Sequence, residues 1–560
     1  MMEETHVHKI PLRPASQVMK LSRMGSAHAH RLSFMRILMR RMQRENWRVE
    51  PTEFNIDGNG VGHAVYTAHT PTRAYSLVAF AHDLPAELRS DRVIAEAWDC
   101  TFTLFDGIPT ADDVQRLSQN VPLQEAGRIS QSELSLSRAN RSVRLWAHVV
   151  DRLANGEQPD AQMVNDVGYL MRTTAVYGSG KFGAADRQDI ADRPEFTAPF
   201  QSEMLSVYLT RTFVMDLVEH MARAKGGDTA VPIDPNMRRQ FGIGNSTGLG
   251  MAPFILNHPI LLNNWVASKE EALSRVRTLT SFTQDDQARF ADLVIRADLN
   301  WQLWHSEHPL QIEKLAALRS DLDALHGFLN AGPIVSWDAI YCWGEENLSE
   351  EGCELVVSLL IECHPEFVDE LSDCMSADES LDFRIKGDVK AGDVLAQIEQ
   401  IYGWADTLDW DENSHNARVW YVSEEKLEPR LGERFEEDDI ADYEQPLSPL
   451  RDVFRFAQCL ESKDKDVTIA EILLAYPEHR HAARRVQIAA KYPYAEIRDN
   501  TICAKMLPID MLRFKLSFFG AKHFDPRSDR WVRINMFAGA PYPQDLANAA
   551  DDWFYPALPS

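Results

Sequence analysis

The spacing of apolar residues predicts helices and strands in different parts of the chain. Residues 27–46 repeat apolar side chains at helical spacing, with arginines on the remaining surface. From residue 47 to residue 106 apolar and polar residues alternate, which is typical of strands. We expect a hairpin of residues 62–70 and 74–83 around Pro71 and Thr72, followed by a third strand at 98–104.

Beyond residue 110 the spacing is mainly helical. Capping patterns begin at Thr110 and Ser130, and the second is expected to open a helix over 130–155. Further helices are predicted at 160–174, 199–225, 257–266, 269–279, 285–304 and 309–329. After Pro333 short helices and strands alternate, with strands at 417–422 and 531–537, and no internal repeat stands out.

These patterns predict an α+β protein that is predominantly α-helical, with three domains. Residues 1–109 would form a basic helix and a small antiparallel sheet. Residues 110–332 would form a helical domain with two glycine-rich turns, and residues 333–560 an acidic mixed α/β domain. The length of 560 residues suits several domains, each with its own core.

The composition is that of a soluble globular protein, with 44% apolar and 25% charged residues. No uncharged apolar run approaches the ~20 residues of a membrane span, and the first residues lack a signal-peptide pattern. We therefore expect a cytoplasmic protein that does not enter a membrane. The seven cysteines include no Cys-x-x-Cys pair, so reduced and mostly buried thiols are expected.

The charge is distributed unevenly along the chain. Residues 345–444 hold 30 Asp or Glu and 7 Lys or Arg, a balance of −23 within a total of −26. Residues 1–50 hold 10 Lys or Arg and 4 Glu, a balance of +6. An acidic protein of this kind repels phosphates, so no nucleic-acid partner is expected. The basic segment is expected to pack on its own domain or on the acidic segment, and self-association into a homo-oligomer is compatible with this pattern.

Two glycine-rich segments, 177–183 and 241–253, hold the main candidate site. Glycine allows backbone N–H groups to approach a ligand closely, and polar side chains are concentrated among these glycines. We predict Tyr177 and Lys181 as catalytic proton-transfer groups, because burial can move a lysine pKa toward neutrality. The predicted substrate-binding residues here are Arg172, Ser179, Asn245, Ser246 and Thr247.

Known nucleotide motifs do not fit these segments. A P-loop would need a glycine where Ala175 stands and a hydroxyl where Phe182 stands, after a strand and not the helix predicted here. A dinucleotide fingerprint would need a third glycine at Thr247 and a preceding strand. Residues 250–259 contain Gly-Met-Ala-Pro and Asn-His-Pro, which is similar to the signature loop of the fumarase and aspartase lyases. That loop has a lysine between its proline and asparagine, which this chain lacks, so no residue role is carried over.

Three weaker candidates complete the analysis. Arg138, Arg141 and Arg144 would form one helical stripe that binds an anion or pairs with acidic neighbours. Lys426 and Arg430, in a charged loop after a predicted strand, are further substrate-binding candidates. No metal site is predicted, and the weak metal candidates are the histidines of the predicted sheet, with Asp83 and Asp99 as the nearest carboxylates in sequence. Those histidines are His63, His69 and His82.

The function that these observations favour is an enzyme that binds a small anionic metabolite, a carboxylate or a phosphate, between the two glycine-rich segments. Lyase or transferase chemistry fits such a pocket, and the cofactor is left unknown. One alternative is a non-catalytic assembly protein that uses the acidic residues 345–444. Another is a metal-dependent enzyme centred on the sheet histidines.

Overall fold

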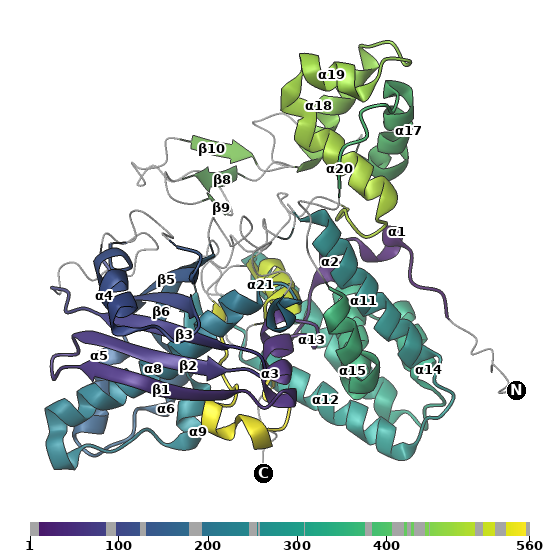
Figure 1. Ribbon diagram of the computed structural model, residues 1–560. Coiled ribbons are helices and arrows are strands. Elements are labelled where there is room, and N and C mark those ends of the chain that lie inside the picture. Colours follow the sequence, from purple (N-terminus) through teal and green to yellow (C-terminus); the bar gives the residue numbers. More distant parts are fainter. Residues whose placement is uncertain are drawn as a thin grey trace, which may run out of the picture.

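The computed structural model confirms a predominantly helical α+β protein with one large mixed sheet (Figure 1). The structure describes residues 10–85, 97–123, 130–178, 193–245, 255, 258–306, 309–375, 383–405, 419–422, 427–429, 443–446, 449–498, 508–520 and 534–555. Among the helices of these residues, none is both long and apolar enough to cross a membrane.

The large sheet has eight strands in the order β1-β2-β3-β4-β5-β6-β7-β11. Neighbouring strands are antiparallel except β6 and β7, which run parallel. The predicted hairpin is confirmed, because His63 pairs with Phe80 across β2 and β3. The strands are β1 (Arg48–Ile56), β2 (Gly62–His69), β3 (Ala74–Ala81), β4 (Cys100–Asp106), β5 (Glu133–Arg141), β6 (Tyr169–Gly178), β7 (Gly242–Asn245) and β11 (Ile534–Met536).

The two faces of this sheet are covered differently. One face is apolar, packs on the long helix α8 (Gln201–Gly226) and belongs to the main core; α5 (Trp146–Ala154) packs against α8. On the opposite face, Val78, Phe80 and Leu136 pack with α4 (Ala111–Asn120) in a small separate core. The predicted capping box at Thr110 and Asp113 opens α4. We call these the α8 face and the α4 face.

Two segments predicted as single helices are each divided between a strand and a shorter helix. Residues 133–141 form β5 and not part of a helix over 130–155, which is reduced to α5. Serines alternate with Leu134 and Leu136 here, so the period-two pattern was present, but the capping pattern at Ser130 obscured it. Likewise α6 (Ala161–Val167) ends at Gly168 in the left-handed conformation, and β6 follows directly.

Helices form the other large part of the molecule (Figure 1). A single helix α11 replaces the two helices predicted between 257 and 279, because no glycine or proline interrupts it. Helix α14 had not been predicted. The helices of this part are α11 (Pro259–Arg277), α12 (Gln284–Gln302), α13 (Pro309–Asn330), α14 (Trp337–Asn347) and α15 (Glu350–Cys363).

Both ends of the chain pack against these helices. The N-terminal segment contains α1 (Ala15–Val18), α2 (Leu21–Met24) and α3 (Phe34–Arg44), so the helix predicted for 27–46 begins at Phe34. Ser26, His30 and Met35 donate backbone hydrogen bonds to residues 513–519, which include part of α21 (Pro508–Phe518). The large sheet takes strands from each of the three predicted domains, since β11 follows residue 333 and β5 to β7 lie between 110 and 332.

Four further helices have a hydrophobic core of their own (Figure 1). They are α17 (Ala391–Tyr402), α18 (Pro449–Glu461), α19 (Ile469–Ala475) and α20 (Arg480–Lys491). Ala391 donates to Val467 O, and Ile469 donates to Val389 O, both at 2.9 Å. These two hydrogen bonds join the start of α17 to the start of α19. Together they form an isolated antiparallel bridge at Lys390 and Thr468. The separate sheet of β8 (Val419–Val422), β9 (Leu427–Pro429) and β10 (Tyr443–Pro446) lies between α17 and α18 in sequence.

Candidate functional site

The parallel pair of β6 and β7 joins the starts of the two glycine-rich segments. Arg172 pairs with Gly244, and Thr173 pairs with Asn245. Directly paired residues share a sheet face and successive residues alternate between faces, so the backbones of Arg172 and Asn245 are close, but their side chains lie on opposite faces of the sheet. Tyr177 lies in β6 opposite Leu136. The other predicted residues, Ser179, Lys181, Ser246, Thr247, Lys426 and Arg430, lie outside the described residues, so their roles stay predictions.

Two glycines of the second segment are explained by packing inside the sheet. A Cβ atom on Gly244 would stand 2.7 Å from the ring of Tyr169. A Cβ atom on Gly242 would collide with the side chain of Asn535 and the backbone of Met536. Both residues lie within β7, after the short helix α9 (Pro235–Gln240), so this Gly-x-Gly does not form a phosphate-binding turn. β6 does supply a strand before Gly180 and Lys181, but Ala175 and Phe182 still exclude a P-loop.

A row of polar side chains crosses the α4 face next to the parallel pair of β6 and β7. His82 donates its backbone N–H to Asp99 O at 2.9 Å, which extends the β3–β4 ladder by one residue. Asp99 N–H donates to Asn140 Oδ1 at 2.9 Å, and Asn140 pairs directly with Arg172. Residues that pair directly share a sheet face. We call His82, Asp99, Asn140 and Arg172 the polar row.

The polar row is buried, which is unusual for four polar side chains in succession. Asp99 is 1% exposed, and Asn140 and Arg172 are each 4% exposed, whereas His82 is half-buried. The backbone of Arg141 donates to Asp99 Oδ2 at 2.9 Å. Burial lowers the pKa of His82, and the nearby Asp99 carboxylate partly opposes this change. The imidazole is therefore neutral at pH 7.

Asn140 has an unfilled hydrogen-bonding group. Its Oδ1 accepts from Asp99 N–H, which fixes the orientation of the amide and leaves Nδ2 as the donor. Nδ2 is buried and has no hydrogen-bond partner among the residues that the structure describes. Leaving such a group unpaired costs about 1–3 kcal/mol. An oxygen acceptor from a water, a ligand or a residue outside the described ones would satisfy this donor.

The predicted arginine stripe does not exist, because these residues lie on β5 and beyond it. Arg138 lies opposite Thr101 on the α4 face, with its guanidinium 4.7 Å from the centre of the Trp98 ring. Arg141 points to the α8 face, where it lies 5.0 Å from the ring of Trp146. Arg141 Nε also lies 3.7 Å from Asp99 Oδ1, so it pairs with one carboxylate of the polar row. Arg138 lies on the α4 face and is a diagonal neighbour of Arg172 across the β5–β6 pair.

The histidines of the sheet do not converge on one point. His63 Nε2 lies 3.0 Å from Glu53, and His69 Nε2 lies 3.0 Å from Glu50, both across the β1–β2 pair. Six residues of strand, about 20 Å, separate these two histidines. Within the described residues, no three His, Cys, Asp or Glu side chains are grouped so that they could hold a metal ion.

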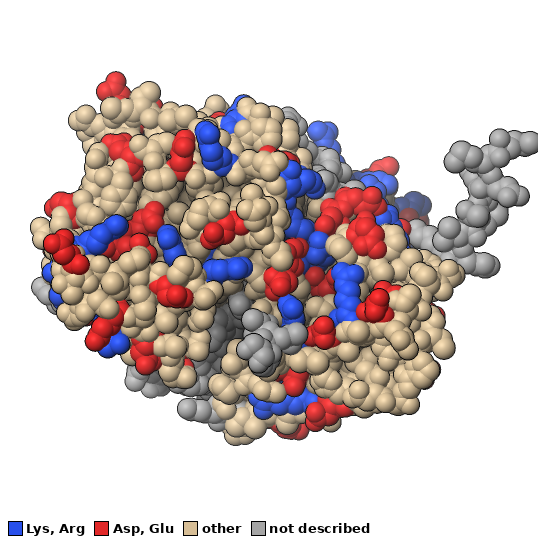
Figure 2. All heavy atoms as spheres, turned by 90° about the horizontal axis from the view of Figure 1, so that it is seen from below, with Lys and Arg blue, Asp and Glu red and all other residues tan. Residues whose placement is uncertain are grey.

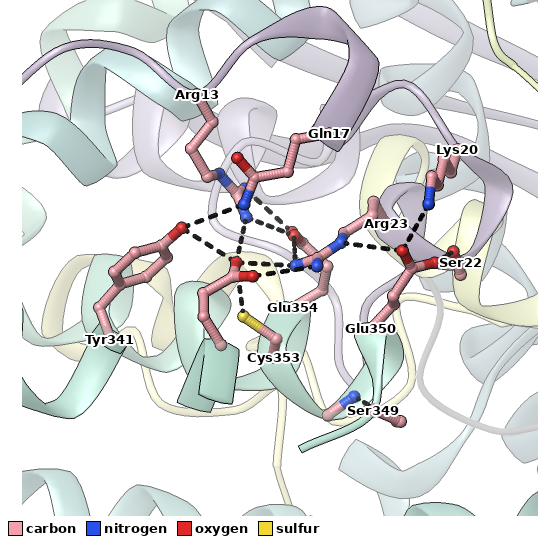
Figure 3. A network of polar contacts seen from close by, with 12 residues as sticks. Arg13, Gln17, Lys20, Ser22, Arg23, Tyr341, Ser349, Glu350, Cys353 and Glu354 are labelled. Carbon is pink, nitrogen blue, oxygen red and sulfur yellow. Dashed lines mark hydrogen bonds and ion pairs between the residues drawn. The ribbon is translucent and has the colours of Figure 1, made fainter. Parts of the chain in front are cut away.

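A second buried polar cluster joins the N-terminal segment to α11, α14 and α15, and Figure 3 shows contacts of that segment with α14 and α15. Arg13 binds both oxygens of Glu270 at 2.8 Å and also binds Glu354 at 2.6 Å. Arg23 binds both oxygens of Glu345 at 2.8 and 3.0 Å. Lys269 also binds Glu354. We call Arg13, Arg23, Lys269, Glu270, Glu345 and Glu354 the ion-pair network.

The ion-pair network is well matched in charge, with three cations against three carboxylates. Glu270 and Glu354 are each 1% exposed, and the cations hold the pKa of Glu354 far below its usual range despite its burial. Tyr341 O–H and Cys353 S–H both donate to Glu345 at 2.9 and 3.0 Å. Burial raises the pKa of the Cys353 thiol above its usual range, so this cysteine is a protonated donor and not a nucleophile.

A third cluster continues along α3 to the C-terminal part of the chain. Arg31 binds both oxygens of Asp369 at 2.8 Å, and Arg36 pairs with Glu362 and with Asp551 at 3.1 Å. His28 Nδ1 lies 2.5 Å from Tyr555 Oη. These contacts confirm the expectation that the basic N-terminal segment packs on the acidic segment of the same chain.

Comparisons with protein-family models, with curated proteins and with solved structures find no match to this chain. The site is therefore argued from its own residues. Sequence reasoning selected Arg172 for its position before the glycines, but it missed Asn140, which was assigned to a helix surface. A signal existed for the strand, since serines alternate with Leu134 and Leu136, but the serines lie on the face opposite to Asn140.

Proposed function

We propose that the chain is a cytoplasmic enzyme that binds a small anionic metabolite over the polar row. The observation that carries this proposal is the buried Asn140 Nδ2, which has no partner among the described residues and lies opposite Arg172. A carboxylate or phosphate oxygen would accept from Nδ2, and the same anion would interact favourably with a neighbouring guanidinium. Arg138 adds a second guanidinium on this face.

The predicted loop residues complete this proposal. Ser246 and Thr247 follow Asn245 directly, and Ser179 and Lys181 follow the end of β6, so both segments start from the parallel strand pair. In sheets with parallel strands, ligands commonly bind beyond the carboxyl ends of those strands. Tyr177 and Lys181 remain the proposed proton-transfer groups of this enzyme. Lyase or transferase chemistry remains the proposed reaction class.

Binding is tested by thermal shift against sulfate, phosphate, dicarboxylates, nucleotides and CoA esters. A ligand at 100 times its Kd stabilises the protein by about 2.7 kcal/mol. Asn140→Asp keeps the acceptor for Asp99 N–H but replaces the donor with a carboxylate that repels an anion. We expect this variant to lose the stabilisation, whereas Asn155→Asp, an equal charge change at an exposed helix end, should retain it. Equal stabilisation of both variants would refute the proposed site.

Lys181→Met tests the loop contribution separately. We expect the melting temperature to change by only a few degrees and ligand binding to weaken strongly, because methionine keeps an unbranched side chain and removes the charge. Lys463→Met is the matched control, since Lys463 lies in the α17–α20 module, 2.7 Å from Tyr476 Oη. If both lysine variants bind the ligand like the unmodified chain, the first glycine-rich segment is architectural.

The alternative of an assembly protein has less support. Glu345, Glu350, Glu354, Glu362 and Asp369 all belong to the acidic segment, and all pair with Arg or Lys of residues 10–44 within the same chain. These carboxylates therefore do not need a basic partner. On the face seen in Figure 2, acidic and basic side chains are interspersed. A sizing column at low and high salt would detect association through the remaining acidic residues.

A further inference from the structure

We propose that His82 is a proton-transfer residue of the same site, acting on the ligand that Asn140 and the two guanidinium groups hold. This inference rests on the proposed function, because it needs an anion over the polar row. It adds a group that the glycine-rich segments do not contain.

The geometry of the sheet brings His82 to the site. His82 follows Ala81 at the end of β3 and lies opposite Asp99, on the same face as Phe80. Asn140 lies one strand further on, on β5, and is joined to Asp99 by a hydrogen bond. The imidazole and the Asn140 amide are therefore about 10 Å apart in backbone position, or two strand spacings. A small metabolite spans that distance.

The surroundings of His82 suit a group that exchanges protons. Its Nε2 lies 3.4 Å from Thr101 Oγ1, a contact too long to hold the ring firmly. The charged or titratable groups around it are Asp99 on the neighbouring strand, Asp83 next in sequence, His63 as a diagonal neighbour on β2, and Arg138 on β5. Burial favours the neutral imidazole, which is the form that accepts a proton.

The other two histidines of the sheet are different. His63 and His69 each lie 3.0 Å from a glutamate of β1, so their imidazoles are already engaged by a carboxylate. Of these three histidines, His82 alone belongs to the polar row. This difference provides a matched control within one sheet.

The proposed step balances in charge and atoms. A C–H or O–H bond next to the anionic group of the ligand breaks, and its proton forms an N–H bond with the neutral imidazole. The electron pair stays on the ligand, where the added negative charge faces Arg138 and Arg172. The imidazolium then returns the proton to the product or to water. This use of histidine as a general base is common at neutral pH.

Proton NMR of histidine-labelled protein tests whether His82 faces the bound anion. Sulfate is the probe, because it does not titrate between pH 5 and 8. We expect bound sulfate to raise the pKa of His82 by at least about half a unit through direct attraction. The pKa of His69 should not change. His82→Gln assigns the signal, and it should bind sulfate within about threefold of the unmodified chain.

The outcomes separate this inference from the proposed function. If sulfate stabilises the chain in a way that Asn140→Asp removes, but the pKa of His82 does not change, the role of His82 is refuted and the anion site stands. If sulfate produces no stabilisation that depends on Asn140, both are refuted. An equal response of His69 would also refute the role of His82, because such a response would show that sulfate binds generally to the surface.

Discussion

The ion-pair network and the polar row are both buried, but they differ in the partners of their polar groups. In the network, Arg13, Arg23 and Lys269 each reach carboxylates, and Glu345 also accepts from Tyr341 and Cys353. In the polar row, Asn140 Nδ2 has no acceptor among the described residues. Buried polar groups in stable proteins are almost always hydrogen-bonded. In the network, Arg23 Nε also has no hydrogen bond, but it lies 3.9 Å from Glu350 Oε1, so this group has an opposite charge nearby. We take such pairing of charges to indicate architecture, and the neutral unpartnered donor of Asn140 to indicate a place for a ligand.

The largest expected effect is the loss of one carboxylate from the ion-pair network. Glu354→Gln removes the charge that Arg13 and Lys269 share; Arg13 keeps Glu270, whereas the buried Lys269 loses the carboxylate that it binds. Breaking a buried pair in this way typically costs about 3–5 kcal/mol. We expect a reduction of this size in the free energy of unfolding, measured by urea denaturation at pH 7. A loss below about 1 kcal/mol would contradict a structural role for the network.

The next largest expected effect is a loss of unfolding free energy in mild acid, caused by two buried histidines near the third cluster, His28 and His30. Burial lowers the pKa of both His28 and His30, so each is neutral in the folded chain. Stability from these groups is complete above their unfolded pKa near 6.5 and is lost as the pH falls toward their folded pKa. We expect a loss of up to about 1.4 kcal/mol per pH unit for each histidine below pH 6.5.

A variant of His30 separates this effect from carboxylate protonation. His30 Nδ1 accepts from Leu32 N–H at 3.0 Å, and an asparagine Oδ1 can take the same place. His30→Asn should therefore retain the fold but show a shallower dependence of unfolding free energy on pH between 7 and 5. The glutamates act in a lower window, because their unfolded pKa is about 4.3 and the arginines lower the folded pKa of Glu362. An unchanged slope would show that His30 does not control this dependence.

The sequence predicted the sheet where alternation was strict and failed where two patterns competed. Residues 62–83 alternate around Pro71 and Thr72, and β2 and β3 formed in the predicted register. β5 and β6 were missed, since a capping pattern and a run of apolar residues fit a helix equally well. Because β5 was predicted as part of a helix, Asn140 was not recognised as a neighbour of Arg172. Pairing between β6 and β7, which are more than sixty residues apart, depends on the tertiary fold and has no local signal.

A smaller change in the free energy of unfolding is expected for an exposed ion pair beside the network. Glu350 binds Lys20 at 2.7 Å, but their side chains are 37% and 34% exposed. Exposed pairs are screened by water and typically contribute about 0–1 kcal/mol. Glu350→Gln should therefore change the free energy of unfolding by less than about 1 kcal/mol, in contrast to Glu354→Gln on the same helix. Comparable losses for both variants would show that burial does not set the difference.

The smallest expected change in stability is at Asn140, if the polar row serves a ligand. Asn140→Asp retains the oxygen that accepts from Asp99 N–H and removes the unpartnered donor. The new carboxylate gains an attraction to Arg172, which offsets part of its desolvation and its repulsion by Asp99. We expect the ligand-free variant to lose no more than about 1 kcal/mol in urea denaturation at pH 7. A loss of the size expected for Glu354→Gln would mean that the row, like the network, is architecture, and that the acceptor for Nδ2 is a structural water.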